Sequence, residues 1–351
     1  MISSKGPSID PAWVDRLPKT TQRVKEEVAR IIVGQDHVVE EILMAFLAGG
    51  HVLLEGVPGL AKTLLVNTLA SALSMTFGRV QFTPDLMPSD LTGSQMMQDD
   101  HRRGQREFVF RRGSIFAHVL LADEINRCPP KTQAALLEGM EEGTVTVGGK
   151  NYALPSPFFV LATQNPIEQE GTYPLPEAQL DRFLIKVLVD YPTLREEWQI
   201  VDQTTSGDQR SLSEVLSRDD ILAWQAVTRA LPVSSHVLDY IARLVRRTRP
   251  SEKSAPDWIR HYCSWGAGTR AALALTAVSK ARTLLRGRFA VTREDVRATA
   301  PLVLRHRILP SFHAEAENIS TNDLVDRLLN DTPAFAERYD YDAATKSFLR
   351  L

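Results

Sequence analysis

The fold of this chain is decided by the stretch His51-Val-Leu-Leu-Glu-Gly-Val-Pro-Gly-Leu-Ala-Lys-Thr63. Its first five residues are a short, mostly apolar run that stops at Gly56, a pattern that predicts a buried strand. After Lys62, apolar residues recur at helical spacing, at Leu64, Leu65, Leu69, Ala72 and Leu73. A strand, a glycine-containing loop and a helix therefore follow one another in the order that phosphate binding requires.

The loop in this stretch departs at one position from the usual pattern G-x-x-x-x-G-K-[ST], because Ala61 replaces the second glycine. We expect the Lys62 ammonium to contact the β- and γ-phosphates and the Thr63 hydroxyl to ligate Mg²⁺. Backbone N–H groups and the positive end of the helix favour the same anion. The predicted phosphate-binding residues are Gly56, Val57, Pro58, Gly59, Leu60, Ala61, Lys62, Thr63 and Leu64. A surface turn with a solvated lysine is the alternative that the loop alone leaves open.

Two carboxylates, Asp123 and Glu124, follow a second apolar run, Leu120-Leu-Ala122. In a nucleotide site, Asp123 would hold the metal through its water shell, and Glu124 would orient and polarise the attacking water. Taken alone, the pair is also compatible with a strand end that meets solvent. Together with the phosphate loop, it predicts a site for ATP and Mg²⁺ in which the metal residues are Thr63 and Asp123.

Two further polar residues lie next to predicted strands. Asn165 ends the run Leu161-Ala-Thr-Gln-Asn165, where its amide could position the water or contact the γ-phosphate, although Asn before Pro166 also opens turns. Arg182 stands just before Phe183 and could clamp a phosphoryl group, although an Asp-Arg pair at a helix end is also typical of a surface salt bridge. The residues alone leave both alternatives open.

Composition describes an ordinary globular protein: 351 residues, 43% hydrophobic, 24% charged and a net charge of −2. A net charge this small does not attract nucleic acid or an anionic membrane to the protein as a whole. Two cysteines, Cys128 and Cys263, favour a reducing compartment and exclude a disulfide framework or a cysteine zinc site. The N-terminus lacks a secretory pattern, and no run approaches the roughly 20 apolar residues of a membrane span. We expect a cytoplasmic protein without a membrane span.

The order of the predicted elements gives the domain organisation. Strands are expected at 51–55, 80–83, 115–122, 158–163 and 183–189, with helices between them, which argues for a parallel sheet covered on both faces. Beyond residue 192 the pattern changes: polar residues 203–210 predict a linker, and the segments after it are helical, with capping signals at Ser217 and Thr292. The expected parts are an irregular lead-in 1–20, an α/β core 21–192, a linker 193–212, an all-α domain 213–310 and a partly helical tail 311–351.

Several ordered blocks resemble the MoxR family of AAA+ ATPases. The blocks are the phosphate loop, Gln81-Phe-Thr-Pro-Asp-Leu-Met-Pro-Ser-Asp-Leu-Thr-Gly93, Leu121-Ala-Asp-Glu-Ile-Asn-Arg127, Pro174-Leu-Pro-Glu-Ala-Gln-Leu-Asp-Arg-Phe183, Trp265-Gly-Ala-Gly-Thr-Arg-Ala271 and Leu304-Arg-His-Arg307. The likeness covers roughly residues 15 to 310, and Ala61 is expected in this family. It implies an AAA+ P-loop core with a five-stranded parallel sheet, followed by an all-α lid.

The resemblance also implies roles for single residues. Asn165 would be sensor 1, and Arg270 would be sensor 2, reaching the γ-phosphate of its own subunit. Arg182 would be the arginine finger that completes the site of a neighbouring subunit. Three residues, Val33, Gly34 and Gln35, resemble the segment that packs around adenine. Catalysis would thus rest on Lys62, Glu124, Asn165, Arg182 and Arg270 in a homo-oligomeric ring, usually a hexamer.

Two segments resemble insertions of related AAA+ proteins. The charged segment Asp99 to Arg112 resembles the insert within helix 2, placed at about 91–113. Residues 143–154 alternate like a hairpin with a Gly-Gly turn and match the hairpin that precedes sensor 1. Both insertions commonly face a ring pore or a partner. The alternative is an exposed segment that contacts neither.

The function implied by the resemblance is ATP hydrolysis that drives chaperone-like remodelling or maturation of a client enzyme, including metal-cofactor insertion. A von Willebrand factor A-domain protein is the expected partner. A nucleic-acid motor and a nucleotide-switch scaffold are the alternatives. Against the motor, the arginines at 243, 246, 247 and 249 have the spacing of a solvated helix face, so no nucleic acid is expected. The histidines lack metal-ligand spacing, so no transition-metal site is expected.

Overall fold

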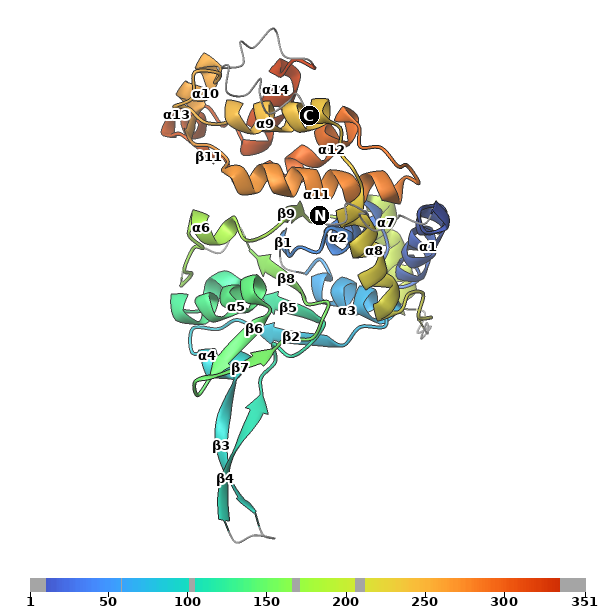
Figure 1. Cartoon of the computed structure of the whole chain (residues 1–351), viewed down its shortest axis with the longest axis vertical. Helices are drawn as coiled ribbons and strands as arrows, with labels where there is room; N and C mark the ends of the chain where they lie inside the picture. Colours follow the sequence, from blue (N-terminus) through green and yellow to red (C-terminus); the bar gives the residue numbers. More distant parts are fainter. Residues whose placement is uncertain (1–10, 58, 101–104, 166–170, 206–211, 335–351) are drawn as a thin grey trace, which may run out of the picture. The chain divides into compact units, whose positions relative to one another are not determined.

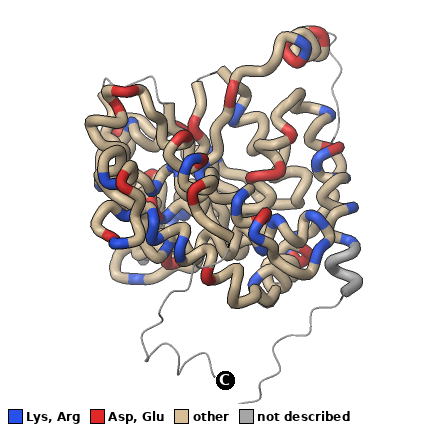
Figure 2. The backbone as a smooth tube through the Cα atoms, turned by 90° about the horizontal axis from the view of Figure 1, so that it is seen from above, with Lys and Arg blue, Asp and Glu red and all other residues tan. Residues whose placement is uncertain are grey.

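The computed structural model describes residues 11–57, 59–100, 105–165, 171–205 and 212–334. The chain divides into two compact units, one of residues 1–231 with 277–289 and one of residues 232–276 with 290–351. Basic and acidic residues are interspersed along the backbone (Figure 2). Within the described part of the chain, no helix is both long and apolar enough to cross a bilayer.

The first unit is built on a parallel sheet of five strands in the order β2-β5-β8-β1-β9 (Figure 1). The strands are β1 (Val52–Glu55), β2 (Phe77–Gln81), β5 (Val119–Asp123), β8 (Phe159–Gln164) and β9 (Ile185–Leu188). This sheet confirms the predicted α/β fold. Strand β5 begins later than predicted, because Ala117 N–H donates to Ile115 O in a turn while the Ile115 side chain is still buried.

The sheet strands are apolar, and the helices of this unit pack on them and bury them. Helices α1 (Pro11–Ala29), α2 (Asp36–Ala48), α3 (Lys62–Ala72), α5 (Pro130–Glu142) and α8 (Arg218–Ala230) belong to this unit, with the short α4 (Pro88–Thr92) and α6 (Glu177–Leu180). Helix α3 contacts β2 and β5, and α2 contacts β9. The core includes the buried residues Leu53, Leu120, Ala122, Val160, Ala162 and Phe183.

Two antiparallel hairpins extend from this unit. Strands β3 (Gly93–Asp100) and β4 (Gln105–Arg112) form the first, at the segment expected to be a helix-2 insert. Strands β6 (Thr144–Val147) and β7 (Lys150–Ala153) form the second. Its turn residues Gly148 and Gly149 have φ of 59° and 76°, values that favour glycine and match the right-handed twist of a hairpin.

The second unit is mostly helical. It contains α9 (Ser235–Arg247), α10 (Asp257–Tyr262), α12 (Arg293–Leu304), α13 (Phe312–Ala316) and α14 (Thr321–Asp331), with the small antiparallel pair β10 (Cys263–Trp265) and β11 (Leu309–Pro310). Helix α11 (Thr269–Leu285) contributes residues to both units. The interior of the second unit contains the buried side chains of Tyr240, Leu244, Ile259, Val296 and Leu328.

The boundaries differ from the expected ones at three places. Helix α1 already begins at Pro11 inside the expected lead-in, because Leu17, Val24 and Val28 bury one face of it. The expected linker contains α7 (Leu194–Thr205), with residues 206–211 outside the described part. Helix α8 belongs to the first unit, where Gln225 Nε2 donates to Phe46 O at 2.8 Å, although we expected it in the all-α domain.

Candidate functional site

The phosphate loop connects β1 to α3, as predicted. Gly59 has φ of 87°, and Ala61 adopts the left-handed conformation with φ 51° and ψ 25° at the N-cap of α3. A Cβ on Gly56 would lie 2.6 Å from the carbonyl oxygen of Val189, so this position excludes a side chain. Alanine at 61 keeps the smallest side chain in a conformation that glycine adopts more easily. Pro58 lies outside the described residues.

Lys62 turns its ammonium back toward the loop. Its Nζ donates to the carbonyl oxygen of Gly56 at 2.5 Å. Burial lowers the pKa of Lys62, and the carboxylates of Asp123 and Glu124 oppose this shift. Because β1 and β5 are the two parallel neighbours of β8, the two predicted halves of the site lie at the same end of the sheet. The fold therefore joins residues that are far apart in the sequence at one end of the sheet.

Asp123 is the last residue of β5 and is held through both of its carboxylate oxygens. Arg79 Nη2 of β2 donates to Oδ2 at 2.7 Å, and Thr163 Oγ1 of β8 donates to Oδ1 at 2.7 Å. The same Thr163 oxygen accepts the N–H of Glu124 at 2.7 Å. Three neighbouring strands thus position one acid. Carboxylate and hydroxyl oxygens, as in Asp123 and Thr63, are the ligands that suit Mg²⁺.

Glu124 follows directly in the left-handed conformation, with φ of 57°. Gln81 Nε2 of β2 donates to its Oε2 at 2.8 Å, and Arg127 Nε forms an ion pair with the same oxygen at 3.2 Å. The strained backbone turns the carboxylate away from the strand direction and into this polar setting. Gln81, Arg79 and Thr163 were not predicted as site residues, because their roles depend on strand neighbours that only the sheet order reveals.

Asn165 lies just beyond β8, whose neighbours in the sheet are β5 and β1. The residue is only 6% exposed. Because parallel strands end at the same edge of a sheet, Asn165 shares the edge that carries the phosphate loop and Asp123. Its burial differs from that of a solvent-exposed turn residue, and the role of its amide at the γ-phosphate stays a prediction.

The two predicted arginines belong to other elements: Arg182 follows α6, and Arg270 lies on α11. Arg182 Nη2 pairs with Glu141 Oε2 of α5 at 3.0 Å. The pair lines a cavity of about 310 Å³ with Glu138, Glu142, Gln179, Ala134 and Leu137. Arg270 is exposed on α11, in the second unit.

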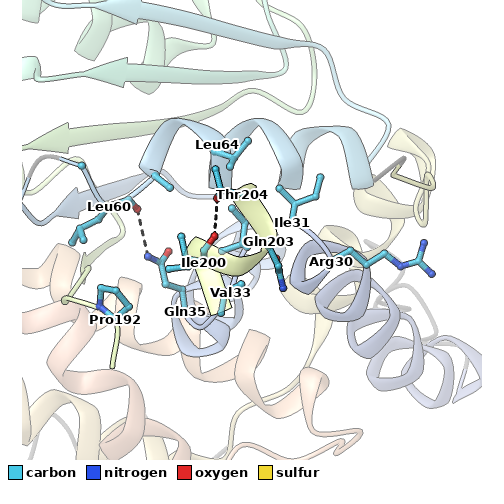
Figure 3. Close-up of a pocket in the computed structure, with 13 residues that line it drawn as sticks. Arg30, Ile31, Val33, Gln35, Leu60, Leu64, Pro192, Ile200, Gln203 and Thr204 are labelled. Carbon is cyan, nitrogen blue, oxygen red and sulfur yellow. Dashed lines mark hydrogen bonds between the residues drawn. The ribbon is translucent and has the colours of Figure 1, made fainter. Parts of the chain in front are cut away.

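A second cavity, of about 350 Å³, adjoins the phosphate loop (Figure 3). Its walls contain Val33 and Gln35 from the predicted adenine segment and the loop residues Gly59, Leu60, Ala61 and Leu64, with Arg30, Ile31, Ile32, Pro192, Ile200, Gln203 and Thr204. We call it the base pocket. Its lining is mainly aliphatic, and its position next to the loop suits a flat base.

Helix α7 supplies a wall of the base pocket that the sequence reading assigned to a linker. Thr193 N–H donates to Glu196 Oε2 at 2.7 Å and caps the helix start. The same Glu196 packs on Gly34, where a Cβ would lie 2.6 Å from its Oε1, and Gly34 has φ of 71°. Leu194, Trp198 and Val201, at helical spacing, were the signal that could have revealed this helix.

Comparison with known proteins agrees with this geometry. The model of the ATPase family associated with various cellular activities (AAA) matches residues 51–185, and an AAA lid domain model matches residues 258–328. Chaperone MoxR1 of Mycobacterium tuberculosis is 45% identical over 310 residues, which are 88% of this chain and 81% of the relative. The chain belongs to the MoxR family of AAA+ ATPases.

Further relatives extend the likeness over most of the chain. Protein MoxR of Methylorubrum extorquens is 30% identical, with 89% of this chain and 94% of the relative covered. A crystal structure of a candidate ATPase of Cytophaga hutchinsonii superposes with a TM-score of 0.85 at 40% identity, covering 93% of this chain and 98% of that one. As in other MoxR-family members, the α/β core is followed by a helical lid.

The arginines of α9 in this MoxR-family lid have partners within their own unit. Arg243 pairs with Asp239 and donates to Pro333 O, and Arg246 pairs with Glu252. Arg247 and Arg249 donate to the carbonyl oxygens of Asp331 and Ala267. These arginines therefore fix α14 and the loop before α11, a structural task that the sequence spacing did not reveal.

Proposed function

We propose that this MoxR-family protein hydrolyses ATP to ADP and phosphate in a homo-oligomeric ring and uses the cycle to remodel a partner protein. The observation that carries the proposal is the convergence of Lys62, Asp123 and Glu124 at one sheet edge, where each is positioned by hydrogen bonds from the chain. A phosphate loop without a positioned acid would bind nucleotide, whereas this edge also holds the acid that activates water.

Each residue of the phosphate end has a defined task in this proposal. The Lys62 ammonium holds the β- and γ-phosphates, and the backbone of residues 56–61 surrounds them. Thr63 and Asp123 hold Mg²⁺, which neutralises charge between the phosphates when bound. Glu124, kept in place by Gln81 and Arg127, accepts a hydrogen bond from the attacking water. Asn165 aligns the same water or the γ-phosphate, and the base pocket holds adenine beside Val33, Gly34 and Gln35.

Two arginines complete the proposed site. Arg182 of a neighbouring subunit stabilises charge on the transferred phosphoryl group, which makes the ring necessary for turnover. Arg270 of the lid contacts the γ-phosphate, and the loss of this contact on hydrolysis couples the reaction to the lid. A hexamer is the expected ring.

The partner assignment rests on the family. A relative carries the name chaperone, which supports action on a protein. We propose a von Willebrand factor A-domain protein as partner and maturation of a client enzyme, with metal-cofactor insertion as one form of it, in the cytoplasm. The internal pairing of the α9 arginines gives no support to a nucleic-acid motor.

The test measures phosphate release by the purified protein with Mg·ATP over a range of protein concentrations. We expect turnover that rises per subunit as rings assemble and that is absent in Lys62→Ala. Single- or double-stranded DNA should leave the rate unchanged. A lack of turnover at every concentration would contradict the proposal, and strong stimulation by DNA would favour the motor.

A further inference from the structure

Asp123, the carboxylate proposed to hold Mg²⁺, is in contact with a cation of its own chain. Arg79 Nη2 of β2 donates to Asp123 Oδ2 at 2.7 Å, the short distance of a charge-assisted hydrogen bond. The other oxygen, Oδ1, accepts the hydroxyl of Thr163 at 2.7 Å. Two donors from the two strands beside β5 therefore share one carboxylate, and Arg79 is the one that carries a charge.

The two donors differ in their freedom to move. Thr163 is 1% exposed, and its oxygen also accepts the Glu124 N–H, so this hydroxyl is fixed between two partners. The Arg79 side chain is 48% exposed, whereas that of Asp123 is 14% exposed. A long, half-exposed guanidinium can leave a carboxylate for water at a small cost in free energy. Arg79 is thus the displaceable partner of Asp123, and Thr163 is the permanent one.

The strand geometry gives a released Arg79 a second acceptor. Arg79 and Gln81 are two residues apart on β2, so their side chains lie on the same face of the sheet. Arg79 Nη2 also donates to Gln81 Oε1 at 3.1 Å, and Gln81 Nε2 donates to Glu124 Oε2 at 2.8 Å. A guanidinium that leaves Asp123 therefore still has a hydrogen-bond partner on its own strand.

The charge of Arg79 changes what Asp123 can hold. Mg²⁺ binds through carboxylate oxygens and loses its own waters reluctantly, so it competes poorly for a carboxylate that is paired with a cation. A metal-free nucleotide is repelled by the carboxylates of Asp123 and Glu124, and Arg79 balances one of these two charges. Arg79 therefore weakens the binding of Mg²⁺ and eases the binding of metal-free nucleotide.

We propose that Arg79 is the counter-ion that Asp123 exchanges for Mg²⁺, and that this exchange limits the preference of the site for Mg²⁺-bound over metal-free nucleotide. Arg79 releases Asp123 Oδ2 when the metal arrives with the nucleotide, while Thr163 keeps Oδ1. The inference rests on the proposed nucleotide site and adds the residue that sets its dependence on Mg²⁺.

The experiment measures the affinity of the full chain for a ribose-labelled fluorescent ADP, once with Mg²⁺ and once with excess EDTA at the same ionic strength. The metal ratio is the dissociation constant in EDTA divided by that in Mg²⁺. Arg79→Met should raise this ratio about fivefold, because Asp123 loses its cation. Arg79→Lys keeps the charge and should stay within about twofold of wild type. A merely structural role predicts the opposite sign for Arg79→Met, since a misplaced Asp123 would hold Mg²⁺ less well.

Two further variants test whether the effect acts through Asp123. Arg260→Met removes a guanidinium of similar exposure, 43%, that pairs with Asp257 in the second unit, and it should leave the metal ratio unchanged. In an Asp123→Asn background, Arg79→Met should change the ratio less than about twofold, because the carboxylate that it would free is absent. A full fivefold rise in that background overturns the inference.

The outcomes separate this inference from the proposed hydrolysis. An unchanged or lower metal ratio in Arg79→Met overturns the inference, whatever the turnover of the wild type. A raised ratio in a chain that shows no turnover supports the inference and contradicts the hydrolysis. If Arg79→Met does not fold, Arg79→Gln carries the same prediction, and a wild-type ratio in Arg79→Gln overturns the inference.

Discussion

The phosphate end and the base pocket of the proposed nucleotide site are built on opposite physical principles. At the phosphate end, Lys62, Asp123 and Glu124 all have hydrogen-bond or ionic partners within the chain. At the base pocket, aliphatic groups form most of the wall. The first end is organised by contacts within the chain, which suits catalysis, whereas the second offers a mostly aliphatic surface, which suits the face of a base.

The largest predicted effect concerns the phosphate end. Arg182→Ala should lower ATP turnover by about 10³-fold or more and leave ATP affinity within about threefold, because an arginine finger acts mainly on the transition state. Steady-state phosphate release and nucleotide titration measure the two quantities. Glu141→Gln is the matched control, since it removes the ion-pair partner of Arg182 and keeps the guanidinium, so turnover should survive. Undiminished turnover in assembled Arg182→Ala rings removes the arginine-finger role.

An intermediate effect is predicted at the opposite end of β1, which supports both halves of the site. Val160 N–H donates to His51 Nδ1 at 3.1 Å, and His51 Nε2 donates to Met140 O at 3.1 Å. Burial lowers the pKa of His51 from 6.5 to about 4. As the pH falls, His51 therefore becomes protonated in the unfolded chain before it does in the folded protein. Its contribution to the free energy of unfolding is complete above pH 6.5 and is lost as the pH falls toward 4. The loss amounts to about 3 kcal/mol.

Urea unfolding of wild type and His51→Gln at pH 7 and pH 4.5 measures this contribution. The wild-type free energy of unfolding should fall more between the two pH values than that of His51→Gln. Because His51 supports the sheet and touches neither end of the proposed site, ATP affinity at pH 7 should be retained by the folded variant. Equal pH dependence of the two proteins contradicts the assigned role of His51.

The smallest predicted effect concerns the base pocket. In Gly34→Ala the new Cβ would meet the end of the Glu196 side chain, and the residue would keep a left-handed φ of 71°. The Glu196 carboxylate must then move away from the Thr193 N–H that it caps at the start of α7. We expect ATP affinity to fall about tenfold, with turnover at saturating ATP within about twofold. The control is Gly149→Ala, which has φ of 76° in the hairpin turn and open space around its Cβ, and which should keep wild-type affinity. A fall in saturated turnover in Gly34→Ala would show that the two ends are not separable.

The sequence predicted the residues of the phosphate end and one side of the base pocket, and it missed the side that α7 supplies. Lys62, Asp123 and Asn165 stand at fixed places beside apolar runs, so local pattern located them. Arg79 and Gln81 escaped notice because their partners, Asp123 and Glu124, lie more than forty residues away.

The helical elements show the same limit. The polar end of α7 suggested a linker, and its place became visible only through its contact with Gly34. The capping pattern at Ser217 predicted the start of α8, and the capping box is present, but capping says nothing about which unit a helix joins. Tertiary contacts decide such questions, and local sequence patterns do not record them.

The central claim is that the Glu124 carboxylate activates the attacking water and that ATP binding does not require this carboxylate. The most direct measurement pairs ATP affinity with single-turnover hydrolysis in wild type and Glu124→Gln. The amide keeps the size of the side chain and can still pair with Gln81, so affinity should stay within about threefold while the hydrolysis rate falls at least about 10²-fold. Hydrolysis by Glu124→Gln at the wild-type rate would contradict the account.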